Sequence, residues 1–85
     1  MNLINWQPKA LRQLRKIEAQ ASRQIRSAVS TELAELATAR NVKALSGHAY
    51  GYRLRVGPYR VLFDFDGAVH IVSIEEVRKR DERTY

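Results

Sequence analysis

The stretch YGYRLRVGPYRVLF (residues 50–63) decides the fold, because apolar and basic residues alternate on both sides of Gly57-Pro58. A period of two is typical of a β-strand with one buried face. Gly57 can supply a positive φ at the first central position of a two-residue turn. The stretch therefore predicts an antiparallel hairpin. Its register places six apolar side chains on one face, as the pairs Tyr52–Phe63, Leu54–Val61 and Val56–Tyr59.

The other face of this hairpin is basic. In the same register Arg55 lies opposite Arg60, and Arg53 lies one step along its strand, with no acidic residue among them. Directly opposed like charges are unfavourable in a sheet. The three arginines are therefore either a solvated surface or a surface that binds a polyanion such as phosphate.

A second hairpin is predicted after the first. Asp66-Gly67 is typical of a type I′ turn, so "AVHIVSI" (residues 68–74) returns as the third strand. This register sets His70 near the apolar face, in a structural role, and brings no carboxylate to the arginine face. The residues involved are the pairs Val61–Val72 and Phe63–His70 on the apolar face, and Ile71 and Ser73 on the arginine face.

The first half of the chain indicates a short strand at residues 2–6, followed by two helices. Pro8 suits the first turn of a helix, and apolar residues recur every three or four positions to about Arg40. We expect a break within residues 18–24, with Ser22 as the N-cap. Residues 37–49 are expected to be a loop, with Asn41 and Gly47 as turn formers. The predicted fold is α+β, with the order β-α-α-β-β-β. A helical hairpin packs on a small, mainly antiparallel twisted sheet in one domain, residues 1–85.

The charge is strongly positive. The net charge is +6 with a sequence pI of about 10.2. This charge either indicates a polyanionic partner (nucleic acid, an acidic membrane surface or an acidic protein) or only keeps the protein soluble. A basic run at residues 78–80 follows the last predicted strand, either as a solvated tail or on the arginine face. Basic residues also line the polar face of the helices, where they are either solvated or contact nucleic acid. They are Lys9, Arg12, Arg15, Lys16, Arg23 and Arg26.

Several classes of site are excluded or disfavoured by composition. The chain has no cysteine, so disulfides, thiolate metal sites and thiol catalysis are excluded. Only two histidines are present, His48 and His70, which makes a histidine metal site improbable. No apolar run approaches the ~20 residues of a membrane span. We expect a cytoplasmic protein with no metal and no cofactor.

Three motifs of the chain occur together in one known family. They are the Leu-x-Gly at residues 45–47, "YRLRVGPYRVLFDFDG" (residues 52–67) and the Val-x-Lys-Arg at residues 77–80. In these motifs the chain resembles the RelE/ParE toxins of bacterial type II toxin–antitoxin systems. RelE-type members cleave mRNA in the ribosomal A site, whereas ParE-type members poison DNA gyrase and lack the cleaving residues. The resemblance implies an antitoxin as partner, and for a RelE-type member the ribosome and mRNA as well.

Residue by residue, the RelE-type cleaving positions match Arg53, Arg55, Arg60, Arg80 and Tyr85 in this sequence. All five are filled by suitable residue types, which favours the mRNA endonuclease over the gyrase inhibitor. The Arg80 to Tyr85 spacing is short by about one residue against the RelE pattern. A non-catalytic nucleic-acid-binding module is a third alternative.

The chemistry can also be argued without the family. RNA is cut without metal when its own 2′-hydroxyl attacks the adjacent phosphate, and preorganised cations stabilise the charge that develops. Tyr85 can stack on an exposed base or donate a hydrogen bond. Arginine is a poor general base because its pKa exceeds ~12. The base is therefore left open among Arg55, Tyr85 and His48.

Overall fold

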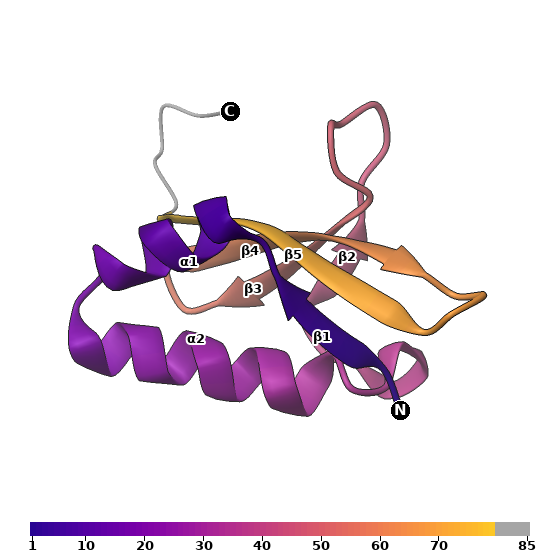
Figure 1. Ribbon diagram of the computed structural model, residues 1–85, viewed down its shortest axis with the longest axis horizontal. Helices are drawn as coiled ribbons and strands as arrows, with labels where there is room; N and C mark the ends of the chain where they lie inside the picture. Colours follow the sequence, from indigo (N-terminus) through magenta and orange to yellow (C-terminus); the bar gives the residue numbers. More distant parts are fainter. Residues whose placement is uncertain (80–85) are drawn as a thin grey trace.

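The computed structural model describes residues 1–79, and its centre is a five-stranded mixed sheet in the order β1-β5-β4-β3-β2 (Figure 1). The strands are β1 (Leu3–Trp6), β2 (Val42–Ala44), β3 (Tyr52–Val56), β4 (Tyr59–Asp66) and β5 (Ile71–Lys79). β1 pairs with β5 in parallel, and all other pairs are antiparallel. The predicted α+β class with a mainly antiparallel sheet is confirmed.

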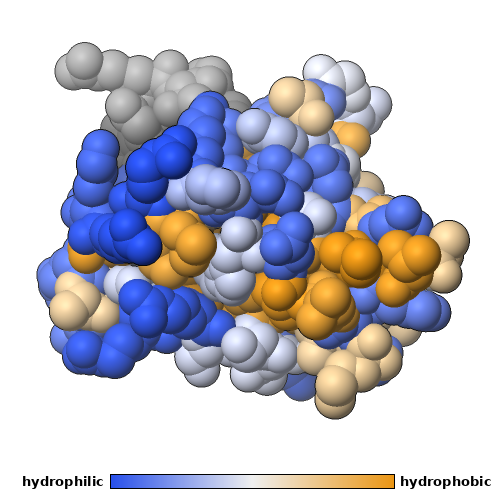
Figure 2. Space-filling view, viewed as in Figure 1, coloured by the Kyte–Doolittle hydropathy of each residue, from blue (hydrophilic) through white to orange (hydrophobic). Residues whose placement is uncertain are grey.

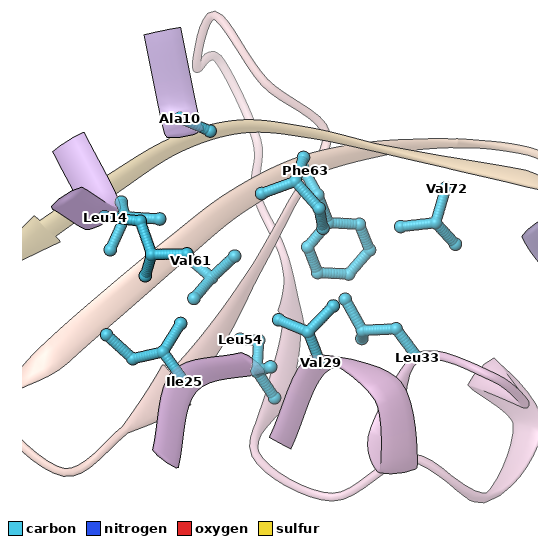
Figure 3. Packing of buried hydrophobic residues seen from close by; sticks show 11 residues of the cluster. Ala10, Leu14, Ile25, Val29, Leu33, Leu54, Val61, Phe63 and Val72 are labelled. Atoms are coloured by element: carbon cyan, nitrogen blue, oxygen red, sulfur yellow. The ribbon is translucent and has the colours of Figure 1, made fainter. Parts of the chain in front are cut away.

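Two helices, α1 (Pro8–Arg15) and α2 (Ala19–Glu32), precede a short 3-10 helix, η1 (Leu36–Thr38). α2 runs along one side of the sheet (Figure 1). Ile25, Val29 and Leu33 point from this side toward Leu54 and Phe63 of the sheet (Figure 3). All five side chains are almost completely buried, so this layer is the core that supplies most of the hydrophobic stabilisation.

The hairpin of β3 and β4 has the predicted register. Tyr52 pairs with Phe63, Leu54 with Val61 and Arg55 with Arg60. Gly57 has φ +55, the left-handed conformation that the tight turn requires.

The predicted register of the second hairpin is wrong. Phe63 pairs with Ile74 and Val61 with Val77, because the turn spans residues 67–70 rather than two residues. The Asp66 carboxylate accepts the Ala68 N–H at 2.9 Å, which opens this wider turn. His70 is exposed in the turn with φ +57 and does not lie near the apolar face.

A β-bulge interrupts this hairpin. Leu62 pairs with Glu76 while the next residue, Phe63, pairs with Ile74, so Glu75 is the extra residue. The bulge turns Glu76 to the arginine face and Val77 to the apolar face.

The helix break lies earlier than predicted. α1 ends at Arg15 and α2 has Glu18 as its N-cap residue, so Ser22 is not a cap. Ser22 is buried one turn inside α2, and its N–H donates to the Glu18 carbonyl at 2.8 Å. The earlier break lets Leu14 and Ile25 both reach the core from different helices.

The predicted loop at residues 37–49 contains a strand that the sequence did not indicate. β2 has only three residues and pairs with β3, with Lys43 opposite Arg53. Asn41 and Gly47 both have positive φ, which confirms them as turn formers.

α1 completes an edge of the sheet that β1 leaves open. β1 pairs with residues 71–74 of β5, while the rest of β5 continues beyond it. Gln13 of α1 accepts the Val77 N–H at 2.7 Å through its side-chain oxygen. This contact satisfies an edge group of β5 and fixes α1 beside the strand. No helix within residues 1–79 is long and apolar enough to cross a membrane.

Candidate functional site

Three arginines lie side by side across the sheet face that points away from α2. Arg55 of β3 pairs with Arg60 of β4, and Arg60 pairs with Arg78 of β5. We call Arg55, Arg60 and Arg78 the arginine row. Neighbouring strands are ~4.8 Å apart, so the row concentrates three permanent cations on a short line of the surface. Arg53 lies one step along β3, opposite Leu62.

A buried carboxylate lies beside the arginine row, on the same face of the sheet. Glu76 shares the next rung with Leu62, and its side chain is only 4% exposed. The prediction that the arginine face lacks a carboxylate is wrong, because the bulge at Glu75 reverses the alternation of β5. Two adjacent glutamates between Ile74 and Val77 break the period of two, and this was the signal that could have revealed the bulge.

Glu76 is held from three directions. The Arg78 Nε donates to its Oε1 at 2.9 Å, and the Arg78 Nη2 donates to its Oε2 at 3.2 Å. From α1, Lys9 Nζ lies 3.4 Å from Oε1 and Gln13 Nε2 donates to the same oxygen at 3.5 Å. The Tyr50 hydroxyl donates from the loop before β3. Glu76 therefore connects α1, the loop and the arginine row.

This environment determines the charge of Glu76. Burial raises the pKa of the carboxyl, but hydrogen bonds from Arg78, Tyr50 and Gln13 and the charge of Arg78 outweigh it and lower the pKa to about 2. The same hydrogen bond to Glu76, with a smaller effect from burial, raises the pKa of Tyr50. Glu76 is therefore ionised at neutral pH and is unsuited to act as a general base.

The loop before β3 also carries His48, whose ring lies near that of Tyr50. The Tyr50 N–H donates to His48 Nδ1 at 3.2 Å, and the two ring centroids are 6.0 Å apart. His48 is exposed. The Asp64 carboxylate accepts the Gly51 N–H at 2.7 Å and ties the end of this loop to β4.

The six basic helical residues are all exposed, and two of them make contacts within the protein. Lys9 reaches Glu76 and joins the arginine face, while Arg26 donates to the Ser22 hydroxyl within α2 at 3.3 Å. Strongly hydrophilic residues gather over the ends of the two helices where α1 leads into α2, and apolar residues gather around β1 (Figure 2).

Of the five predicted cleaving residues, the structure brings together Arg53, Arg55 and Arg60. Arg80 and Tyr85 lie outside the described residues. Within residues 1–79 no group of three or more His, Asp or Glu side chains could hold a metal ion.

Comparison with known proteins identifies the family. A family model described as the ParE toxin of the type II toxin–antitoxin system parDE matches residues 4–84. The chain belongs to the ParE toxin family. It is thus a toxin of the RelE/ParE superfamily of type II toxin–antitoxin systems, which confirms the resemblance seen in the sequence. No match to a curated protein sequence was found.

Solved structures of RelE toxins share the fold. One is the RelBE2 toxin–antitoxin complex of Mycobacterium tuberculosis, with TM-score 0.82, 24% identity, and coverage of 93% of this chain and 98% of that chain. Another is the isolated Escherichia coli RelE toxin, with TM-score 0.78, 18% identity, and coverage of 96% and 87%. The RelE–RelB complex of Pyrococcus horikoshii matches with TM-score 0.72, 19% identity, and coverage of 95% and 97%. At these identities the likeness shows the fold.

Proposed function

We propose that this ParE-family toxin is a metal-independent, ribosome-dependent mRNA endonuclease that inhibits translation. The observation that carries the proposal is the alignment of Arg55 and Arg60 with Arg78 on three adjacent strands. Guanidinium groups suit phosphate because they are planar, permanently charged and offer several N–H donors.

In this proposal the 2′-hydroxyl of the mRNA attacks the adjacent phosphate in the ribosomal A site. Negative charge develops on the phosphoryl oxygens, and the guanidinium groups of Arg53, Arg55 and Arg60 stabilise it. Arg80 and Tyr85 complete the site, as the RelE-type pattern implies. Because Glu76 is held ionised by its partners, proton removal stays with Arg55, Tyr85 or His48, of which the arginine is chemically the poorest base.

The exposed basic residues of the helices dock the toxin on ribosomal RNA, through phosphate contacts that supply affinity rather than sequence choice. The residues proposed for docking are Lys9, Arg12, Arg15, Lys16, Arg23 and Arg26. The solved structures from M. tuberculosis and P. horikoshii are a RelBE2 toxin–antitoxin complex and a RelE–RelB complex, which supports an antitoxin partner for this chain. The proposed place of action is the cytoplasm.

Primer extension on translated mRNA, after induction of the toxin, tests the proposal. We expect new cleavage sites with the wild type and a loss of about 10²–10³-fold with Arg60→Ala, the size seen when one charge-stabilising donor is removed. Lys79→Ala is the matched control, because it removes the same charge from the opposite face, where Lys79 pairs with Tyr59. Absence of cleavage by the wild type, or equal cleavage by Arg60→Ala, would falsify the proposal.

The match to a family model named for ParE favours one alternative, a DNA gyrase inhibitor without nuclease activity. It predicts DNA damage signalling without mRNA cleavage. It also predicts that toxicity survives replacement of Arg53, Arg55 and Arg60, whereas the endonuclease loses toxicity with any of them.

A further inference from the structure

Arg78 is the member of the arginine row that the RelE-type pattern does not include. It lies directly across from Arg60, and its side chain is 50% exposed, so its guanidinium borders both the row and solvent. The next residue, Lys79, points to the opposite face. Because side chains alternate along β5, the adjacent cations Arg78 and Lys79 lie on opposite faces of the sheet.

The Arg78 guanidinium is fixed along one edge. Nε and Nη2 donate to the two oxygens of Glu76 at 2.9 and 3.2 Å, in a two-bond fork. A guanidinium has five N–H donors in a rigid plane, so this fork orients the remaining donors without occupying them. An arginine held in this way loses little side-chain freedom when it meets a second anion.

Glu76 is itself fixed in place. Its side chain is 4% exposed, Gln13 of α1 and Tyr50 donate hydrogen bonds to it, and Lys9 of α1 forms an ion pair with it. Gln13 in turn accepts the N–H of Val77, so the carboxylate and the strand that carries Arg78 share one support.

We propose that Arg78 contacts RNA phosphate as part of the arginine row, and that Glu76 is the positioning residue that orients it. This inference deepens the proposed function and rests on it for the cleavage readout. It adds one contact residue and one positioning residue to the site.

Two measurements test the inference. The first is the cleavage rate and half-saturation on purified ribosomes carrying mRNA in the A site. The second is the salt dependence of binding to a labelled single-stranded RNA oligonucleotide. The variants are Arg78→Ala, Arg78→Lys and Glu76→Gln, with Lys79→Ala as the charge-matched control. Far-UV circular dichroism and urea midpoints establish that each variant is folded.

We expect Arg78→Ala to lower the saturating cleavage rate about 10–100-fold and to flatten the slope of log K against log salt by ~0.7, the value for one phosphate contact on a single strand. Arg78→Lys keeps the charge but cannot form the fork, so it should keep most of the slope and lose most of the rate. Glu76→Gln should lower the rate while leaving the slope unchanged. Lys79→Ala should change the rate less than threefold.

Equal rates and slopes for Arg78→Ala and Lys79→Ala would overturn the contact role of Arg78. A full rate in Arg78→Lys would overturn positioning by Glu76, and so would a full rate in folded Glu76→Gln. Arg78→Lys also tests the positioning role if Glu76→Gln fails to fold. Absence of cleavage by the wild type rejects the proposed function instead, and the slope comparison then decides the contact role of Arg78 independently.

Discussion

The two faces of the sheet differ in what they contribute, although the same strands build both. Toward α2, Leu54, Val61 and Phe63 are almost completely buried. Toward the opposite side, Arg55 of β3 pairs with Arg60 of β4, so this face carries charge. Alternation along a strand therefore lets one short sequence carry a core and a charged surface with little compromise between them.

The arginine face is not wholly exposed, because two of its side chains are buried. Leu62 is 5% exposed and Glu76 is 3% exposed, although both lie on this side of the sheet. Glu76 is contacted by Gln13 of α1 and by Tyr50 of the loop before β3. The comparison of faces thus gives three expectations, which we order by size.

The largest effect is expected on the apolar face. Phe63→Ala leaves a cavity among fully buried side chains, and we expect the free energy of unfolding to fall by about 3–5 kcal/mol. For a domain of this size that is most of its stability. Urea denaturation checks it, with Phe63→Leu as a milder control. If Phe63→Ala stays within about 1 kcal/mol of the wild type, this face does not dominate stability.

An intermediate effect is expected at Glu76. Its pKa of about 2 in the folded state lies below the ordinary value of 4.5, so ionised Glu76 stabilises the fold above pH ~4.5, and this contribution is lost as the pH falls through about 2. Glu76→Gln should cost about 1–2 kcal/mol at pH 7 and should reduce the loss of stability between pH 5 and 2.

Melting temperatures measured across this pH range test the expectation for Glu76. Glu18→Gln is the matched control, because Glu18 is an exposed glutamate whose side chain makes no capping hydrogen bond. An acid-dependent loss of stability in Glu76→Gln as large as that of the wild type would contradict a stabilising role for the carboxylate.

The smallest effect is expected in the arginine row. Arg55→Ala removes one of two directly opposed cations, and like charges in this position are destabilising by a few tenths of a kcal/mol up to about 1 kcal/mol. We expect the free energy of unfolding to stay within about 0.5 kcal/mol of the wild type or to rise. A fall above about 1 kcal/mol, measured against Lys79→Ala by urea denaturation, would show that the arginine face is needed for folding.

The first hairpin could be predicted from sequence because a tight turn at Gly57 and strict alternation fix its register locally. The second could not, because the Asp66 contact to Ala68 widens the turn and the bulge at Glu75 arises from packing against β4 and α1. Because the predicted register was wrong, the sequence did not predict that Glu76 lies on the arginine face. It therefore did not predict that Glu76 connects α1 to the arginine row.

The helices, too, could be predicted only in part from the sequence. Apolar periodicity predicted two helices correctly, but it continued past Glu32 and did not place the break before Ala19. The strand β2 has only three residues, too few to show a period of two in the sequence. Arg80 and Tyr85 remain predictions from the family pattern.

The pairing of β1 with β5 has a consequence for how the toxin comes to fold during its own synthesis. The first strand of the sheet finds its only strand partner in the last described strand, with almost the whole described chain between them. Contacts of such long sequence separation form late and slowly. We therefore expect a nascent chain to remain without a complete sheet, and without an assembled arginine row, until β5 has left the exit tunnel of the ribosome that makes it.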